Sequence, residues 1–311
     1  MRDALNDNMD YEFDQPVLQS IYNKWRGQGL KIFKNRYYAV LTVGGIDARG
    51  KIDTYGNYLE SILAAYKPRL LKNNSRENMA VFLGRVLSPL SKPKPKTANQ
   101  EIAALATADD IEFMKNGLVK YNNGNSEMYS AMLSFKSAPD YLDEEFYDTV
   151  STIQTEMITL NAFRIMGAGD VEKTIKQRRT TADTSLDSTE EQIYAAEAVM
   201  DENVVGNQNM VNYYPLFVLS GKSIDDLDKH IAEFKKICAS FGVTPVVESF
   251  AARVSWFAQI PGFDVFPRTF KLMSKTAAVS IPMSSQPTGI SNSDWGEGPL
   301  VVFPTAQGTP Y

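Results

Sequence analysis

Two segments contain glycine and lysine at a spacing that comes close to a phosphate-binding motif. A P-loop has the pattern G-x-x-x-x-G-K-[ST] between a strand and a helix, and its glycines let backbone N–H groups close around phosphate oxygens. In segment 167–174, Glu172 stands where the second glycine belongs, and a helix is predicted before it. Segment 220–223 has a predicted strand before it and a helix after it, but Leu216 replaces the first glycine. We therefore expect neither segment to bind nucleotide, and we interpret the second as a turn that Ser223 caps.

The other reactive residue types are too few for a metal centre or a nucleophile–base pair. The chain has one cysteine, Cys238, and one histidine, His230, so disulfides and Cys/His zinc sites within one chain are excluded. Cys238 lies among apolar positions and is expected to be a small buried hydrophobe. His230 lies beside the same apolar stripe, and we expect it at the core edge or in solvent. The carboxylates at 143–145 are expected to form a solvated helix start, where they favour the helix dipole.

Composition limits the classes of protein that this chain can represent. It has 311 residues, of which 43% are hydrophobic and 22% are charged, and this indicates a globular protein long enough for two modest domains. The formal net charge of -5 disfavours a dedicated nucleic-acid binder. No stretch approaches the roughly 20 apolar residues that span a bilayer, and the acidic start is not a signal peptide. We expect a soluble chain or one that lies on a membrane surface.

Two basic regions have a membrane or partner contact as one interpretation. Residues 15–36 predict an amphipathic helix that includes Trp25 and has basic residues between or after its apolar positions. Lys92, Lys94 and Lys96 alternate with prolines in an extended loop. The alternative interpretations are a helix that packs on its own domain and a loop that is simply solvated.

The first half of the chain predicts strands and helices in an α+β order. Strands are expected at 37–43, 80–87 and 126–135, and a long helix at 142–166. A further helix, capped by Asp53, has an apolar face with helical spacing: Tyr55, Leu59, Ile62, Leu63 and Tyr66. This order suits helices on one face of an antiparallel sheet.

The second half predicts a strand–helix–strand unit. A strand at 213–220 precedes a helix that Ser223 caps, with Asp226 three residues further on, and Gly242 ends that helix. A strand at 243–250, a short helix at 251–259 and a turn at Pro261-Gly262 follow. We predict an α+β fold of two sheet-and-helix modules with a ferredoxin-like tendency, joined by a helical connector. The predicted divisions are an arm (1–36), the first module (37–166), the connector (167–205), the second module (206–262) and a C-terminal segment (263–311).

An ordered set of motifs near the C-terminus resembles a known family. The motifs are Trp256 to Gly262, Pro267-Arg268, Pro287-Thr288-Gly289, Trp295-Gly296 and Gly308 to Tyr311. They resemble the CagE/TrbE-type family of conjugal-transfer and type IV secretion ATPases, in which they close the N-terminal region just before the RecA-like motor. Features upstream occur in the family's order but are less specific: Arg36-Tyr37-Tyr38, Gln177-Arg178-Arg179, the alanine-rich stretch 195–198 and the strand at 216–219.

The resemblance implies a division of labour within a longer protein. For the whole protein it implies ATP hydrolysis with Mg²⁺ by a hexameric motor in machines for DNA transfer or virulence. The present chain ends at Tyr311, before the Walker motifs, so for this piece it implies no catalytic, cofactor-binding or metal-binding residue. It implies instead docking to inner-membrane components and contacts with other copies, on the cytoplasmic face of the bacterial inner membrane.

The same resemblance singles out residues for structural roles. The family-motif residues are Trp256, Pro261, Gly262, Pro267, Arg268, Pro287, Gly289, Trp295 and Gly296. The proline–glycine turns are expected to shape the link to the motor, and Trp295 to anchor it by burial; maintenance of the fold alone is the alternative. Arg268 is expected either to pair with a neighbouring subunit or to reach a neighbour's nucleotide.

Two other functions stay open on the residues alone. A stand-alone enzyme with a carboxylate site would have a deep pocket with strongly shifted Asp or Glu pKa values. A single-stranded DNA-binding module, suggested by the aromatic content and the basic loops, would show a salt-dependent affinity.

Overall fold

A computed structural model describes the larger part of the chain. The residues described are 2–4, 16–27, 33–66, 68, 71, 76–91, 109–138, 142, 144–167, 169–174, 176–177, 209–281, 301 and 303. Within these residues the strands form one nine-stranded sheet, in which each pairing is antiparallel. The strands are β1 (Arg2–Ala4), β2 (Phe33–Asn35), β3 (Asp110–Phe113), β4 (Val119–Asn122), β5 (Glu127–Ser137), β6 (Met157–Ile165), β7 (Met210–Gly221), β8 (Thr244–Val247) and β9 (Phe270–Met273).

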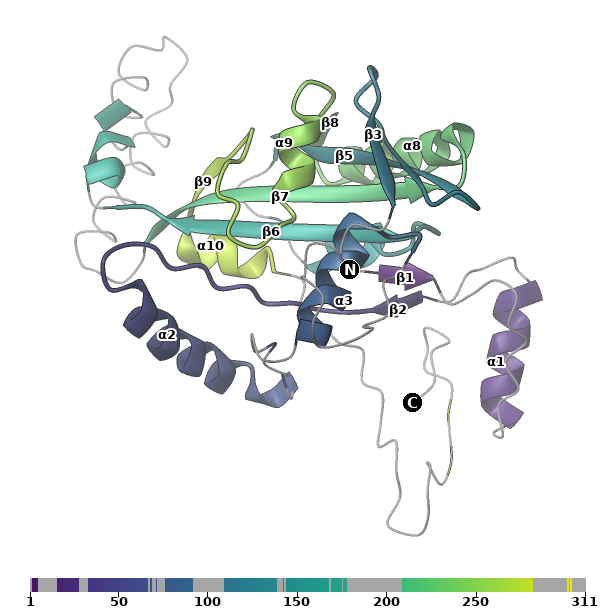
Figure 1. Cartoon of the computed structure of the whole chain (residues 1–311), viewed down its shortest axis with the longest axis horizontal. Coiled ribbons are helices and arrows are strands. Elements are labelled where there is room, and N and C mark those ends of the chain that lie inside the picture. The colour runs from purple at the N-terminus through teal and green to yellow at the C-terminus, as the bar shows by residue number, and fades with distance from the viewer. Residues whose placement is uncertain are drawn as a thin grey trace.

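The helices of the described part cover both faces of this sheet or lie beside it (Figure 1). They are α1 (Pro16–Gly27), α2 (Ala48–Ile62), the 3₁₀ turn η1 (Ala64–Tyr66), α3 (Arg76–Leu87), α5 (Glu144–Val150), α8 (Ile224–Ser240), α9 (Ala252–Phe257) and α10 (Ser274–Val279). This mixture confirms the predicted α+β class.

The centre of the sheet has a ferredoxin-like topology. The main strand order is β2-β1-β6-β7-β5-β4-β3, and β8 and β9 pair with β5 and β7 respectively. The unit β5-α5-β6-β7-α8-β8 therefore has the spatial order β8-β5-β7-β6, which is a βαββαβ arrangement with two split crossovers. Its first half comes from the predicted first module and its second half from the predicted second module. Strands of both modules thus pair within one sheet, where two separate sheets were expected.

The central strand β7 shows why this sheet is buried on both faces. Phe217 and Leu219 point into the cluster under α5 and α8, whereas Leu216 and Val218 point into the cluster under α3 and α9. Such two-sided burial explains an almost continuous apolar run rather than an alternating one. Pro215 lies between the residues of β7 that pair with β9 and those that pair with β5. A residue without a backbone N–H fits that interval.

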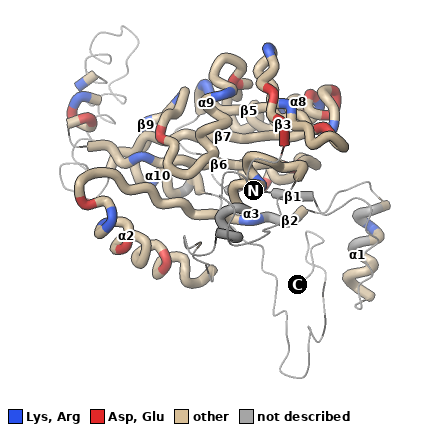
Figure 2. Tube along the Cα trace, in the orientation of Figure 1, with Lys and Arg blue, Asp and Glu red and all other residues tan. Residues whose placement is uncertain are grey.

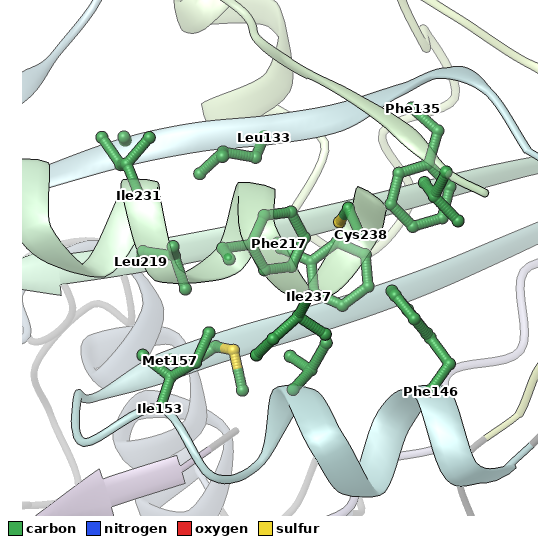
Figure 3. Packing of buried hydrophobic residues seen from close by; sticks show 14 of the residues in the cluster. Leu133, Phe135, Phe146, Ile153, Met157, Phe217, Leu219, Ile231, Ile237 and Cys238 are labelled. Atoms are coloured by element: carbon green, nitrogen blue, oxygen red, sulfur yellow. The ribbon is translucent and has the colours of Figure 1, made fainter. Parts of the chain in front are cut away.

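The cluster under α5 and α8 is rich in aromatic rings (Figure 3). Phe146 of α5 and Phe234 of α8 meet Phe217 of the sheet, with ring centroids 6.1 and 4.9 Å apart. Cys238 is fully buried in the same cluster, as predicted. Burial raises the pKa of its thiol to about 12, so the thiol stays protonated at neutral pH.

Several predicted elements are confirmed, and three are wrong. Strands 126–135 and 213–220, the helix after Ser223 and the short helix at 251–259 are present. Residues 37–43 form no strand, because the nearby strand pairing is made by β2 instead. Residues 80–87 belong to helix α3, in which Phe82 and Val86, one turn apart, both pack on the sheet.

The predicted helix at 142–166 is also wrong beyond its first turns. Helix α5 ends at Val150, and β6 then pairs with β7 from Met157 to Ile165. The spacing of Ile153, Met157 and Leu160 fits a helix, but a nine-residue ladder to the central strand outweighs that local preference. Asp53 lies within α2 rather than at its N-cap, because the helix already begins at Ala48.

Candidate functional site

The turn between β7 and α8 is the better of the two predicted phosphate-loop candidates. The strand ends at Gly221, whose backbone packs so closely on α8 that a Cβ there would lie 2.6 Å from the backbone nitrogen of Leu227. Ser223 accepts a hydrogen bond of 3.1 Å on Oγ from the backbone N–H of Asp226. Only glycine fits at this junction, and Ser223 is the predicted helix cap.

Polar groups of the chain itself fill the N-terminus of α8. Asp226 Oδ2 accepts a hydrogen bond of 3.2 Å from the backbone N–H of Lys222. His230 Nδ1 lies 3.0 Å from the carbonyl oxygen of Ser220, and its Nε2 lies 3.8 Å from Asp226 Oδ1. A carboxylate therefore stands where a bound phosphate would have to approach, and it repels an anion. His230 is buried beside the core, which is one of its two predicted positions.

The second candidate, segment 167–174, begins a helical turn. The backbone N–H groups of Asp170 and Val171 each donate to the carbonyl oxygen of Gly167 over 3.0 Å. Glu172 pairs with Lys176 at 2.7 Å, and the hydrogen bond from that lysine lowers the pKa of the exposed glutamate. At the end of the segment, buried Thr174 accepts a hydrogen bond from Lys271 Nζ over 2.9 Å. These contacts hold a helix start in place rather than a loop around a ligand.

The family-motif residue Trp256 joins α9 to the sheet. Its side chain is buried, and its Nε1–H donates a hydrogen bond of 2.8 Å to Tyr121 OH on β4. The ring also meets Phe113 of β3 edge-on, with centroids 5.8 Å apart. Burial raises the pKa of Tyr121, so the tyrosine stays neutral and receives this hydrogen bond as a hydroxyl. The sequence motif identifies Trp256, but it does not identify Tyr121 as the residue that accepts this hydrogen bond.

Arg268 lies in an ion pair within its own chain. Its Nε donates over 3.0 Å to Oε1 of Glu248, a residue that is only 3% exposed, whereas the arginine side chain is 43% exposed. Ser134 of β5 donates a hydrogen bond to the same oxygen. The hydrogen bond with Glu248 raises the pKa of Arg268. Glu248 was missed by sequence reasoning, although a lone glutamate after the apolar run of β8 is the signal that would have pointed to it.

The proline–glycine motif before Arg268 forms the predicted turn. The backbone N–H of Phe263 donates to the carbonyl oxygen of Ile260 over 3.1 Å, and Gly262 has φ +86°, which favours glycine. Phe266, next to Pro267, then stacks on Tyr214 with centroids 5.1 Å apart. The turn thereby carries the chain back onto the face of the sheet beside α9.

The remaining predicted residues lie largely outside the part of the chain that the structure describes. Trp25 belongs to α1, but its side chain is not among the described ones. The others that lie outside the described residues are Lys92, Lys94, Lys96, Pro287, Gly289, Trp295 and Gly296. Their predicted roles stay predictions.

The described carboxylates, basic residues and helices bear on the enzyme and DNA-binding alternatives. The shifted carboxyl pKa values among the described residues are those of Glu127 and Glu172, which hydrogen bonds from Lys120 and Lys176 lower. Within the described ranges, no three His, Cys, Asp or Glu side chains are grouped so that they could hold a metal ion. Lysine, arginine, aspartate and glutamate are interspersed along the described elements (Figure 2).

None of the described helices has the length and apolar character needed to cross a membrane.

Comparison with known proteins places this geometry in a family context. A model of the CagE, TrbE, VirB family, described as a component of the type IV transporter system, matches residues 69–268. A comparison with curated proteins found no match. The matched range includes the whole ferredoxin-like unit, together with Trp256 and Arg268.

Proposed function

Because the chain belongs to the CagE, TrbE, VirB family of type IV transporter components, we propose that it is the non-catalytic assembly and docking region of a type IV secretion or conjugation ATPase. In this proposal it attaches the motor to inner-membrane components and to neighbouring copies, as a peripheral protein on the cytoplasmic face. ATP and Mg²⁺ belong to the motor of the full-length protein, and this region holds neither.

The single observation that carries the non-catalytic part is the closed N-terminus of α8. Of the two phosphate-loop candidates, this turn has the required order of strand and helix. Two of its backbone N–H groups, those of Lys222 and Asp226, already donate to the side chains of Asp226 and Ser223. A helix N-terminus that is free can bind an anion, but one that already has a carboxylate in its first turn, here Asp226, disfavours a second negative charge. The described backbone around Lys222 therefore does not form the ring of N–H groups that holds a phosphate in a P-loop.

The docking part of the proposal rests on the family and on the hydrogen bonds that the family-motif residues make. The family-motif residues Trp256 and Arg268 are bonded to Tyr121 and Glu248 of the same chain. These two residues stabilise the sheet and the segments that pack on it. Contacts with other components are then made by the outer surfaces of this domain. In this proposal the domain positions the motor and takes no part in hydrolysis.

A nucleotide assay on the purified 311-residue chain tests the first part. We expect no turnover of ATP in the presence of Mg²⁺ and no saturable binding of a fluorescent ATP analogue. The matched variants Lys222→Ala and Lys173→Ala should give the same baseline as the unchanged chain. Turnover or binding that disappears in either variant would overturn the non-catalytic assignment.

Affinity capture from membranes tests the docking part. The tagged chain, expressed in cells that contain a type IV machine, should co-purify with inner-membrane components of that machine from the detergent-solubilised membrane fraction. The same chain expressed in cells without the machine serves as the control for non-specific capture. Absence of any secretion component above that control would contradict docking.

A further inference from the structure

Helix α2 presents an apolar stripe of which Ile52, Tyr55 and Ile62 are exposed, and Ala48 and Leu59 half-buried, among the described residues. None of its fifteen residues is buried, and Figure 1 shows it beside the sheet rather than on either face. Tyr55 is 51% exposed and Ile62 is 58% exposed. An isolated helix of this length is marginally stable in water, so an uncovered apolar stripe points to a partner that packs on it.

The stripe follows a heptad, with the exposed Tyr58 at a g position beside it. With Ile52 taken as position a, the a and d positions along α2 are all apolar: Ala48, Ile52, Tyr55, Leu59 and Ile62. Apolar residues at the a and d positions form the seam along which one helix packs lengthwise against another. A broad membrane-binding face would instead need basic residues in excess on the polar side. Here Arg49 and Lys51 are offset by Asp53 and Glu60.

We propose that α2 pairs with α2 of a second copy of this chain, antiparallel, about a two-fold axis at the level of Asn57. In this register every a residue faces a d residue. Ile52 meets Ile62 of the second copy, and Tyr55 meets Leu59 of the second copy, so that four apolar layers stack along the seam. A two-fold interface of this kind is self-complementary, because the same patch serves on both subunits.

The charges along the helix favour this orientation over a parallel pair. The e and g positions beside the seam carry Arg49 and Lys51, which both lie in the first turn. A parallel pair would bring four positive charges together at one end, whereas the antiparallel pair separates them to opposite ends. Like charges that face each other across a helix pair weaken it, so charge selects the antiparallel arrangement.

Gly56 gives a second, independent indication of a close neighbour. A glycine in a helix interior destabilises the helix relative to alanine, and a Cβ at this position would meet nothing within 4 Å in its own chain. The fold of the single chain therefore gives no reason for glycine here. In the antiparallel pair, Gly56 is an e position immediately beside the two-fold axis, where the helices cross and where a missing side chain allows closer approach.

Sedimentation equilibrium of the purified chain over a range of concentrations tests the pairing. We expect a reversible dimer, and we expect Leu59→Lys to raise its dissociation constant by at least about a hundredfold, since each dimer loses two buried leucines. The far-UV circular dichroism of the body should not change, because Leu59 belongs to neither of the two described hydrophobic clusters. Asn57→Lys, on the outer face of α2, should leave the dissociation constant unchanged. A chain that stays monomeric at high concentration, or a dimer that survives Leu59→Lys, would overturn the proposal.

Disulfide crosslinking tests the orientation. The double variant Ile52→Cys with Ile62→Cys should form an intermolecular disulfide, whereas each single variant should not. Within one helix these positions are about 15 Å apart, too far for an internal disulfide. Crosslinking by Ile52→Cys alone would show a parallel pair and contradict the antiparallel register. The native thiol of Cys238 is buried and should give no crosslink in the unchanged chain.

The α2 pairing rests on the proposed assembly role for its biological meaning. The measurement of the dimer does not depend on that role. The dimer is measured with the pure chain in the absence of membranes. If it fails while capture from membranes succeeds, the assembly role stands and the α2 pairing falls. The converse result would leave α2 as a self-association site in a chain that docks to nothing else.

Discussion

At the scale of single residues, the ion pair of Arg268 and Glu248 joins three parts of the chain. Glu248 lies beyond the end of β8, Ser134 lies in β5, and Arg268 follows the proline–glycine turn. A buried carboxylate needs such donors, because removal from water penalises its charged form. The resemblance suggested an intersubunit or nucleotide-directed role for Arg268, whereas the structure places this side chain in a bond within its own chain.

We predict that Arg268→Ala lowers the free energy of unfolding by roughly 1–3 kcal/mol, a range typical of lost hydrogen bonds to charged groups. The arginine is partly exposed, so the effect should lie below that of breaking a fully buried pair. Urea unfolding followed by tryptophan fluorescence measures it. The double variant Arg268→Ala with Glu248→Gln should lose less than the sum of the two single variants, because it leaves no unpaired charge. Simple additivity would contradict the pairing.

Trp256 supports a second prediction at this scale. Trp256→Phe keeps an aromatic ring against Phe113 but removes the donor to Tyr121 OH, and it should lower the free energy of unfolding by roughly 1–3 kcal/mol. The neighbouring Phe257, 38% exposed, gives the control: Phe257→Leu should cost at most about 0.5 kcal/mol. Equal losses in the two variants would mean that this hydrogen bond has no special weight.

At the scale of elements, the junction of β7 and α8 behaves as a local unit. Ser223→Ala should lower the free energy of unfolding by about 0.5–2 kcal/mol, because the N–H of Asp226 loses its acceptor. Ser223→Asn should recover most of that loss, since asparagine is an equally good cap and adds no negative charge beside Asp226. Thermal unfolding compared with Ser240→Ala, at the other end of the same helix, measures the difference. A loss in Ser223→Asn as large as in Ser223→Ala would mean that the loss does not come from the cap hydrogen bond.

At the scale of the whole molecule, buried tyrosines couple stability to alkaline pH. Burial raises the pKa of Tyr147 and of Tyr214 to about 12, and it also raises the pKa values of Tyr121 and Tyr213. An unfolded tyrosine has a pKa near about 10. Above that pH the unfolded chain releases protons that the folded chain retains, so stability falls with increasing pH.

We therefore predict full stability below about pH 10 and a progressive loss between about pH 10 and 12, worth roughly 2–3 kcal/mol for a tyrosine shifted by two pKa units. Urea unfolding at a series of pH values, with phenolate absorbance recorded in parallel, measures it. Tyr147→Phe should make the decline shallower, whereas Tyr58→Phe, on the exposed helix α2, should not. An unchanged slope in Tyr147→Phe would contradict the prediction.

Local sequence determined those features that depend on neighbouring residues. Ser223 and Asp226 cap α8 because the cap is a bond across three residues, and Gly262 turns the chain because its φ is intrinsic to glycine. The apolar stripes likewise identified β5, β7 and the burial of Cys238. One cysteine and one histidine were enough to exclude disulfides and Cys/His zinc sites within the chain.

Tertiary structure alone decided the features that join distant segments. The spacing around Met157 suits a helix, yet pairing with β7, more than fifty residues away, makes it strand β6. The same long-range pairing unites both predicted modules in one sheet, and it brings Glu248 to Arg268 and Tyr121 to Trp256. Local patterns carry no information about such partners, because the free energy that selects them comes from contacts that exist only once the chain has folded.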